Sequence, residues 1–361
     1  MSPVLSVAID RFHPRPNSID HAGDRITRME FMTYRPRSLF HRLVVRRFVQ
    51  AVVLVLLLVA INFFLIHLAP GDPVYYLAGQ SGDEAYYALI RAQFGLDQPL
   101  WTQLWVYLSS ILRGDLGYSL SYQQSVSAVI LSRVPATLLL ILSSVLVASV
   151  GGVILGVEAA RREDSYLDRA LNTFVLLGYS LPSFSIGHLL LLFFALYLGL
   201  FPAQGMVSAN QDLTGVSYLF DLLAHLALPC LTLAIVQLAQ IMRLTRAQML
   251  NVLGENFIIT ARAKGVVEGR VLYVHALRNA LLPVVTIIGS DLGMLLSGAV
   301  LTETVFGYPG LGRLTLEAVA ARDYPVLMGL FLMISIAVAT LNFITDITYP
   351  LIDPRIRYSR G

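Results

Sequence analysis

The sequence is poor in charge and nearly devoid of cysteine. Only 14% of its 361 residues are charged and 56% are apolar, whereas roughly a quarter of the residues in an ordinary soluble domain are charged. So apolar a chain cannot hide its surface as a water-soluble enzyme, and it is too apolar to be disordered over most of its length. The single cysteine, Cys230, excludes an intrachain disulfide and a cysteine-based metal cluster.

Lysine is almost absent as well. Of the 26 basic residues only Lys264 is a lysine, and Gly265 follows it. The chain therefore lacks Gly-x-x-x-x-Gly-Lys-Ser/Thr, the loop that cradles nucleotide phosphates. His-Glu-x-x-His and Gly-x-Ser-x-Gly are absent too. We predict no catalytic residues, no metal ligands and no cofactor bound by this chain alone.

Long apolar runs take the place of charge. A transmembrane helix needs about 20 apolar residues to cross a hydrocarbon core of roughly 30 Å. Runs this long without strict alternation are helices, because lipid offers no partner to an open backbone. We predict an all-α membrane protein with six transmembrane helices. The spans cover residues 48–69, 137–157, 171–200, 219–242, 281–302 and 326–351.

The basic residues are sorted between the two sides of these spans. Alternate connecting segments carry 21 basic residues on one side and 5 on the other. Because cytoplasmic segments hold the excess of arginine and lysine, we expect both termini and the loop 243–280 to be cytoplasmic. Residues 1–40 lack helical periodicity and are expected to form a disordered cytoplasmic tail. The predicted permease domain covers residues 41–358, and residues 359–361 are the C-terminal end.

Polar residues inside a span deserve weight, because burying them in lipid is costly. Asp291 lies in the fifth span and Asn342 in the sixth. Each residue is a candidate for lining a translocation path. A buried structural contact between helices is the alternative for both.

The loop 243–280 carries the most specific signal. Helix-forming residues fill 255–264, and Gly265 suits the left-handed position after a helix end. A second helical stretch begins near Glu268. We predict a helix, a glycine turn and a helix, with Phe257, Ile258 and Ala261 presented to a groove on another protein. A solvated connector is the alternative.

The loop resembles the ATPase-coupling loop of binding-protein-dependent ABC transporter permeases, and in particular the B-type permeases of dipeptide, oligopeptide and nickel importers. The resemblance covers residues 40–358. In the wider superfamily a glutamate stands where this chain has Ile259. The matching motifs are Thr-Ala-Arg-Ala-Lys-Gly at 260–265, His-Ala-Leu-Arg-Asn-Ala-Leu-Leu-Pro at 275–283, Ala-Pro-Gly-Asp-Pro at 69–73, Arg-Gly-Asp-Leu-Gly-Tyr-Ser at 113–119, Glu-Thr-Val-Phe-Gly-Tyr-Pro-Gly-Leu-Gly at 303–312, Arg-Asp-Tyr-Pro-Val at 322–326 and Asp-Pro-Arg-Ile-Arg at 353–357.

The resemblance implies two functional regions at opposite membrane faces. One is the cytoplasmic loop that meets the ATPase, and the other is an outer rim that docks the binding protein or acts as a gate. A purely structural role is the alternative for the outer turns. The implied ATPase-coupling residues are Thr260, Ala261, Lys264, Gly265, Glu268, His275 and Arg278. The implied outer residues are Asp72, Pro73, Glu303, Phe306, Pro309 and Gly310.

The resemblance further implies a type I ABC importer in the cytoplasmic membrane of a prokaryote. Its expected partners are a second, C-type permease, two cytoplasmic ATPases that bind ATP and Mg, and an extracytoplasmic solute-binding protein. No nucleic acid is expected among them. Di- or oligopeptide is the expected substrate, with nickel, glutathione or a sugar as alternatives. A secondary transporter is disfavoured, because ionisable residues within the spans are few.

Overall fold

The structure, a computed structural model, describes residues 36–68, 83–93, 95, 97–119, 121–209 and 213–352. For residues 36–43, 66, 90, 93, 179, 290–298, 346 and 348–352 the backbone alone is described. Arg47–Gly361 form one compact unit, and the contacts below lie within it. The predicted tail 1–40 and the C-terminal residues 359–361 fall almost wholly outside the described residues.

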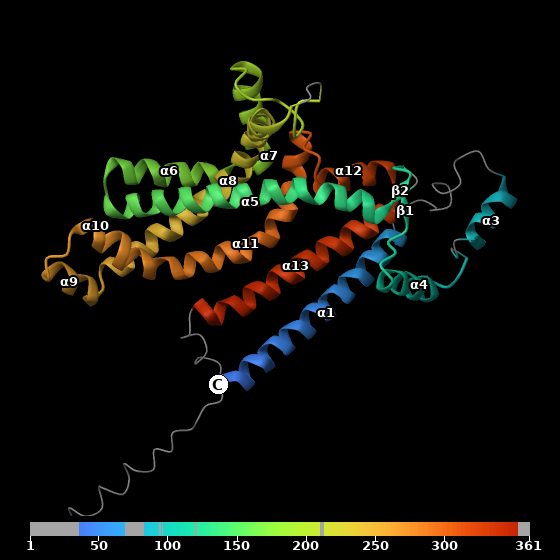
Figure 1. The fold of residues 1–361 in the computed structure, drawn as a ribbon, viewed down its shortest axis with the longest axis horizontal. Coiled ribbons are helices and arrows are strands. Elements are labelled where there is room, and N and C mark those ends of the chain that lie inside the picture. The colour runs from blue at the N-terminus through green and yellow to red at the C-terminus, as the bar shows by residue number, and fades with distance from the viewer. Residues whose placement is uncertain are drawn as a thin grey trace, which may run out of the picture. The chain divides into compact units, whose positions relative to one another are not determined.

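The described part of the chain is built almost entirely of helices (Figure 1). The only strands described are β1 (Tyr118–Ser119) and β2 (Gln124–Ser125), which pair antiparallel. Two short segments, η1 (Leu191–Tyr197) and η2 (Val271–Ala276), are π-helical. The α-helices are α1 (Pro36–Leu68), α3 (Glu84–Gln93), α4 (Leu100–Leu112), α5 (Val126–Arg161), α6 (Tyr166–Ser180), α7 (Ser183–Leu190), α8 (Gly215–Leu253), α9 (Asn256–Ala263), α10 (Glu268–Arg270), α11 (Leu277–Val305), α12 (Leu311–Ala321) and α13 (Tyr324–Ile352).

Every predicted span is helical, but the third is broken. Five helical stretches are long and apolar enough to cross a membrane, and α6 with α7 and η1 forms a sixth if the bent pair is one span. That pair is bent by 106°, and the break falls at Leu181 and Pro182. Proline has no N–H to donate and its ring clashes with the preceding turn, which favours a break at Pro182, although Pro135, Pro229 and Pro283 lie inside continuous helices.

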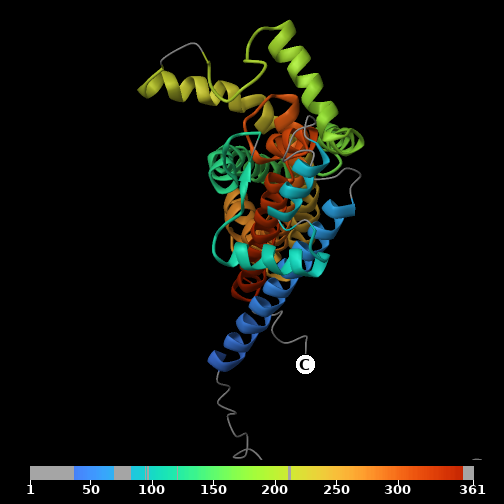
Figure 2. The same cartoon turned by 90° about the vertical axis from the view of Figure 1, so that its right-hand side faces the viewer.

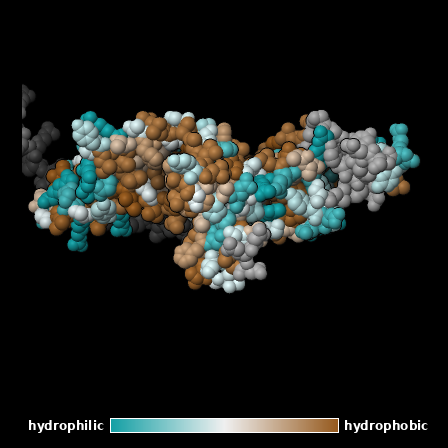
Figure 3. Space-filling view, turned by 90° about the horizontal axis from the view of Figure 1, so that it is seen from above, coloured by the Kyte–Doolittle hydropathy of each residue, from teal (hydrophilic) through white to brown (hydrophobic). Residues whose placement is uncertain are grey.

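The helices present apolar side chains outward. On α5 the leucines at 138, 142 and 146 are exposed at helical spacing, as expected for a lipid-facing stripe. Figure 3 shows a broad area of brown, apolar residues over the left-centre of one face, with hydrophilic residues gathered at the left end and again to the right of the centre. An exterior of this kind suits a bilayer, because in water contiguous apolar patches of this extent are rare.

Helices α5 and α8 form the most extensive contact in the unit, and they run side by side in Figure 1. At Gly152 and Gly156 the two helices approach closely. A Cβ added at Gly156 would lie 2.6 Å from the Thr245 Cβ, and one at Gly152 would lie 2.8 Å from the Ile241 Cβ. Hydrogen at these positions lets the two backbones meet, as in small-residue packing of membrane helices.

We expect Gly156→Ala to weaken the α5–α8 contact by about 1–3 kcal/mol, the usual range for overpacking. The new methyl group would also lie 2.8 Å from the Met242 carbonyl oxygen, which the helix backbone holds in place. Gly151→Ala is the matched control, because its Cβ would meet only the flexible end of Leu238. Unfolding by SDS in mixed micelles measures both. Equal stability of the two variants would contradict the close approach.

At the end of the unit that holds β1, β2 and α12, here called the hairpin end, polar contacts fix the start of α13. Asp323 accepts a hydrogen bond from the Val326 N–H at 3.3 Å and another from the buried Ser119 hydroxyl at 2.5 Å. Tyr122 donates to Glu317 at 2.8 Å, and burial, with this hydrogen bond, raises the pKa of Tyr122 to about 12. Through the bond from Val326 to Asp323, the Arg-Asp-Tyr-Pro-Val motif caps the start of α13.

Candidate functional site

The predicted helix–turn–helix in the loop 243–280 is present. Helix α8 extends eleven residues beyond the predicted span end, to Leu253, and α9 (Asn256–Ala263) follows after a short turn. The chain then passes through α10 and η2 into α11 without leaving helical geometry. The end of the unit that holds α9 and α10 is called the loop end below (Figure 1).

Gly265 closes α9 with a left-handed turn. Its φ is +77°, a conformation open to glycine at little cost. The Val266 N–H donates to the Ala261 carbonyl at 3.2 Å, and the Gly265 N–H donates to the Arg262 carbonyl at 2.9 Å. These two bonds define a Schellman motif, which satisfies carbonyls that a helix end would otherwise leave without partners. The predicted glycine cap is confirmed.

An ion pair fastens the two sides of this turn. The Arg262 guanidinium donates to both carboxylate oxygens of Glu268, at 2.6 and 3.2 Å. This fork geometry fixes direction as well as distance, and the hydrogen bond to Glu268 raises the pKa of Arg262. Both side chains are exposed, so the pair adds little to the free energy of folding. Its effect is to fix the relative orientation of α9 and α10.

The inner face of α9 packs on the protein's own helices. Ile258 is fully buried in a cluster with Met249, Val271 and Leu272, and Ala261 packs against it. The expectation that Ile258 faces a partner is therefore wrong, because this side chain anchors α9 to α8 and η2. The apolar residues that α9 and its turn present outward are Phe257, Ile259 and Val267.

A carboxylate at the end of α5 also holds the loop. Glu158 accepts a hydrogen bond from the Tyr273 hydroxyl at 3.1 Å. It also forms an ion pair with Arg161 at 3.1 Å. Tyr273 belongs to η2, so this contact joins η2 to α5. Together with the Ile258 cluster, it makes the loop an ordered extension of the helices rather than a solvated connector.

The predicted coupling residues divide into two groups. Thr260, Ala261, Lys264, Gly265 and Glu268 gather around the one turn between α9 and α10. Lys264 is exposed there. His275 lies in η2, half-buried, and Arg278 lies exposed at the start of α11. The second group therefore follows the turn along the chain rather than forming it.

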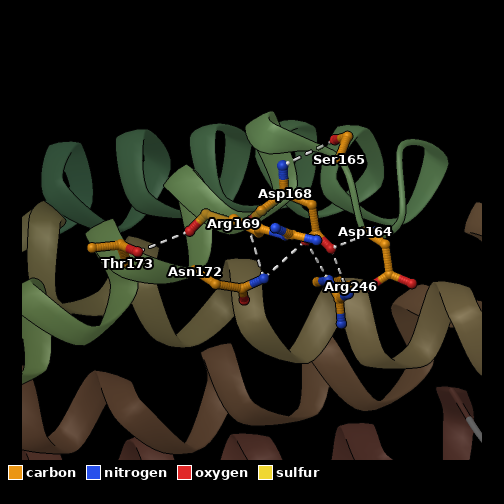
Figure 4. Close-up of polar contacts among 7 residues, drawn as sticks. All are labelled: Asp164, Ser165, Asp168, Arg169, Asn172, Thr173 and Arg246. Atoms are coloured by element: carbon orange, nitrogen blue, oxygen red, sulfur yellow. Dashed lines mark hydrogen bonds and ion pairs between the residues drawn. The ribbon is translucent and has the colours of Figure 1, made fainter.

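A buried ion pair at the loop end was missed by the sequence analysis (Figure 4). Arg246 of α8 donates to both oxygens of Asp168 on α6, each at 2.7 Å. Asn172 and the Asp164 N–H complete the shell around this carboxylate, at 2.8 and 3.1 Å. Asp168 is buried, whereas Arg246 keeps 22% of its side chain exposed. The two bonds from Arg246 clamp α6 to the part of α8 that leads into the coupling loop, and the bonds from Asn172 and Asp164 hold the carboxylate in place from its own side.

At the hairpin end, Glu303 is fully buried. It accepts hydrogen bonds from the Thr137 hydroxyl at 2.6 Å and from the N–H groups of Gly312 and Arg313 at 2.7 and 3.1 Å. The last two open α12, so the carboxylate caps this helix and ties it to α5. A Cβ at Gly310 would overlap the Glu303 carboxylate, so glycine is required there.

Three of the other predicted outer residues, Phe306, Pro309 and Gly310, lie close to this cap. Phe306 and Gly310 are buried and Pro309 is half-buried, so of these only Pro309 offers surface. Asp72 and Pro73 lie outside the described residues. All of these residues were predicted to lie on an outer rim. Their burial shows that Glu303, Phe306 and Gly310 shape the hairpin end from within.

We expect Glu303→Gln to destabilise the chain by about 1–3 kcal/mol, the range for leaving buried hydrogen-bonding groups unsatisfied. The amide offers one acceptor oxygen where the carboxylate offers two, and its NH2 group faces N–H donors. Glu317→Gln is the control, because that carboxylate is partly exposed and accepts from side chains only. SDS unfolding compares the two. A Glu303→Gln variant as stable as the control would contradict the capping role.

The two residues predicted for a translocation path are not brought together. Asn342 is exposed on α13. Asp291 lies within α11, but its side chain is outside the described residues. Their role in a path stays a prediction.

A helical chain with an apolar exterior, five or six spans and an ordered helix–glycine–helix loop at one end belongs to the class of multi-span membrane transport components. Two family models identify it further. Residues 152–358 match the binding-protein-dependent transport system inner membrane component, and residues 40–141 match the N-terminal membrane component of the same systems. The chain belongs to this family.

Curated relatives resemble the chain over most of its length. It is 39% identical over 318 residues to the dipeptide transport system permease protein DppB of Escherichia coli K12, covering 83% of this chain and 94% of the relative. It is 40% identical to a probable peptide ABC transporter permease, y4tP, of Sinorhizobium fredii (87% and 99% covered). It is 38% identical to the glutathione transport system permease GsiC of Salmonella choleraesuis (87% and 98% covered).

A solved structure shares the fold. The inward-facing MetNI methionine ABC transporter matches with a TM-score of 0.50 at 17% sequence identity, covering 62% of this chain and 95% of the matched chain. At this identity the likeness concerns the fold alone. It supports the predicted importer-permease fold.

Proposed function

We propose that this chain is the permease subunit of an ABC importer that carries di- or oligopeptides across the cytoplasmic membrane. The observation that carries the proposal is the ordered loop end, where α9, the Gly265 turn and the Arg262–Glu268 pair form one stiff unit anchored to α5 and α8. A segment that passes a movement of the ATPase to the membrane helices must be rigid. It must also make different contacts in the two conformational states of the transporter. Family membership and the peptide permeases among the relatives supply the context.

In this proposal the loop end meets an ATPase subunit. The outward side chains Phe257 and Ile259 are the apolar contacts, and Lys264 and Arg278 flank the ATPase groove with positive charge. A short helix that lays apolar side chains into a groove is a recurring mode of recognition. Two such ATPases would bind ATP and Mg, and a second, C-type permease would complete the membrane part.

The proposal places the loop end and both termini in the cytoplasm of a prokaryotic cell, on the strength of the arginine distribution. The hairpin end then faces the solute-binding protein. Among the predicted outer residues of the Glu303–Gly312 motif, half-buried Pro309 offers surface for docking or gating there, and Asp72 and Pro73 are proposed to join it. Glu303 would act from beneath by holding α12.

We expect single-cysteine labelling to separate the two ends. In a Cys230→Ala background, Tyr118→Cys at the hairpin end should react in intact cells with a membrane-impermeant maleimide. Val267→Cys at the loop end should react only after the membrane is opened. Both native side chains are well exposed, at 53% and 76%, so access decides the outcome. The reverse pattern would overturn the orientation.

Uptake by the complete transporter tests the substrate. The chain is reconstituted in liposomes with its partner permease, ATPases and cognate binding protein, and ATP-dependent uptake of a radiolabelled dipeptide is measured. Competition by tripeptide supports a peptide importer. Uptake of glutathione, a nickel chelate or a sugar in place of peptide would establish that compound as the substrate. Glutathione is included because one relative is a glutathione transport permease. Peptide uptake without ATPase subunits would indicate a secondary transporter and overturn the proposal.

A further inference from the structure

Helix α4 (Leu100–Leu112) stands apart from the membrane spans. It has 13 residues and none of them is charged. At 1.5 Å per residue it is about 20 Å long, too short for a hydrocarbon core of roughly 30 Å. The chain has two tryptophans, and both, Trp101 and Trp105, belong to this helix.

The side chains of α4 sort into three faces. Leu104 and Tyr107 lie on the face that packs against the protein. Trp101, Trp105 and Leu112 follow one another at spacings of four and seven residues, and so share a second face. They are 72%, 72% and 87% exposed. A third, mainly polar face holds Thr102, Ser109 and Ser110, with Val106 between them.

The packed face fixes α4 to the ends of two spans. Tyr107 stacks on Phe63 of α1 with ring centroids 6.0 Å apart, and its hydroxyl donates to the Met328 carbonyl of α13 at 3.4 Å. Gln103 meets His67 of α1 at 3.2 Å. In Figure 2 the teal helix α4 is seen lengthwise, whereas α5 is seen nearly end-on. Helix α4 thus runs across the direction of the spans.

The exposed face of α4 continues the apolar outside of α1. Trp101 packs edge-to-face against Phe64 with ring centroids 5.4 Å apart. Leu65, next to Phe64 on α1, is 59% exposed. Val53, Leu57 and Ile61 prolong the exposed apolar surface of α1. Since α1 is apolar enough to cross a membrane, this surface faces lipid, and the tryptophans lie where it ends.

We propose that α4 is an interfacial helix whose tryptophan face rests in the headgroup–acyl boundary of the bilayer. Tryptophan favours this layer, because its ring is apolar and its indole N–H can bond to water or headgroups. The polar face of α4 then meets water, and the packed face holds the helix to α1 and α13. The helix pins the hairpin end of the unit at a fixed depth. This proposal rests on the membrane location of the chain and not on the transported substrate.

A spin label on α4 tests the proposal in the complete transporter in liposomes. In a Cys230→Ala background, Trp105→Cys carries a nitroxide, and collision rates with oxygen and with a water-soluble nickel chelate are compared. Oxygen concentrates in lipid and the chelate in water. We expect a positive logarithm of the oxygen-to-nickel ratio at position 105. Thr102→Cys on the polar face is the matched control, with a negative value expected.

Two outcomes would overturn the proposal. Strong collision with the nickel chelate at both positions would place the tryptophan face in water. Weak collision with both reagents at position 105 would mean that another protein chain covers it. A peptide uptake assay that fails leaves these readings unchanged, so the two proposals fail separately.

A second measurement uses the native tryptophans of α4 as the probe. Tryptophan fluorescence of the complete transporter is recorded in liposomes whose lipids carry bromine near the headgroup or near the chain end. The difference from a Trp101→Phe, Trp105→Phe variant isolates α4 from the partner chains. We expect this difference signal to be quenched more by shallow bromine than by deep bromine. Absence of quenching by either lipid would overturn the proposal.

Discussion

Replacing Asp168 by asparagine is expected to destabilise the chain by about 3 kcal/mol. Removing one partner of a buried ion pair typically costs about 3–5 kcal/mol, because the remaining charge stays buried and unpaired. The Arg246 side chain keeps 22% exposure, so water screens part of its charge and the lower end applies. Asparagine fills nearly the same volume, so the loss reports charge and hydrogen bonding rather than a cavity.

The double variant Asp168→Leu, Arg246→Leu separates the charge from the contact. Replacing both members of a buried pair by apolar residues is often close to neutral, so we expect the double variant to lose less than Asp168→Asn alone. Asp164→Asn is the comparison variant and should lose less, because the Asp164 backbone N–H donates to Asp168 while its carboxylate acts on Arg246 only through space. The free energy of unfolding in SDS titration measures all three. A double variant weaker than the single one would contradict the ion-pair account.

Much of the fold follows from the sequence, because lipid imposes a strong rule. Backbone groups without water must bond within their own helix, so an apolar run such as 137–157 predicts a helix. The rule says nothing about where a helix leaves the bilayer. Helix α5 accordingly extends from Val126 to Arg161, well past the apolar run. Pro182 by itself marks only a weak point in the run 171–200, and the 106° bend depends on what packs on either side.

Contacts between distant residues could not be predicted in the same way. Asp168 and Arg246 are 78 positions apart, and each alone resembles an ordinary charged residue near a helix end. Ile258 illustrates a different gap. Its place on an amphipathic helix predicts burial, but not whether the buried face meets a partner or the same chain. Only the packing of Ile258 on Met249 and Val271 decides that.

Glu303 was placed in the right motif with an incomplete role. The motif 303–312 reads as turns because of its glycines and proline, which is correct for Gly307 with its φ of +56°. A carboxylate among such turns suggests an exposed contact. Here the Glu303 carboxylate is buried. It accepts hydrogen bonds from Thr137, on a helix far away in sequence, and from two N–H groups of α12. A helix that starts eight residues after an acidic residue is too distant for that residue to be recognised as its cap.

Gly265→Asp is expected to reduce ATP-dependent uptake at least tenfold while ATP hydrolysis continues. Tenfold corresponds to about 1.4 kcal/mol, and a like charge or an unpaired charge in an interface costs several kcal/mol. The φ of +77° strains any residue with a Cβ, but aspartate is one of the few that adopt this conformation, and its Cβ would meet nothing within 4 Å. We therefore expect the chain to fold and insert. Uptake and ATPase activity are measured on the same reconstituted transporter. Unchanged uptake would show that the turn does not meet the ATPase.

Two controls assign the effect to charge at this turn. Gly265→Asn carries the same shape without the charge, and asparagine and aspartate both tolerate the left-handed conformation that Gly265 adopts. We expect this variant to retain most uptake. Gly269→Asp adds the same charge four residues further on, where a Cβ also meets nothing within 4 Å, and should be milder. If Gly265→Asn loses as much uptake as Gly265→Asp, backbone strain at the Schellman turn is responsible rather than the carboxylate. The stiffness of the α9–α10 unit would then be what the transporter requires.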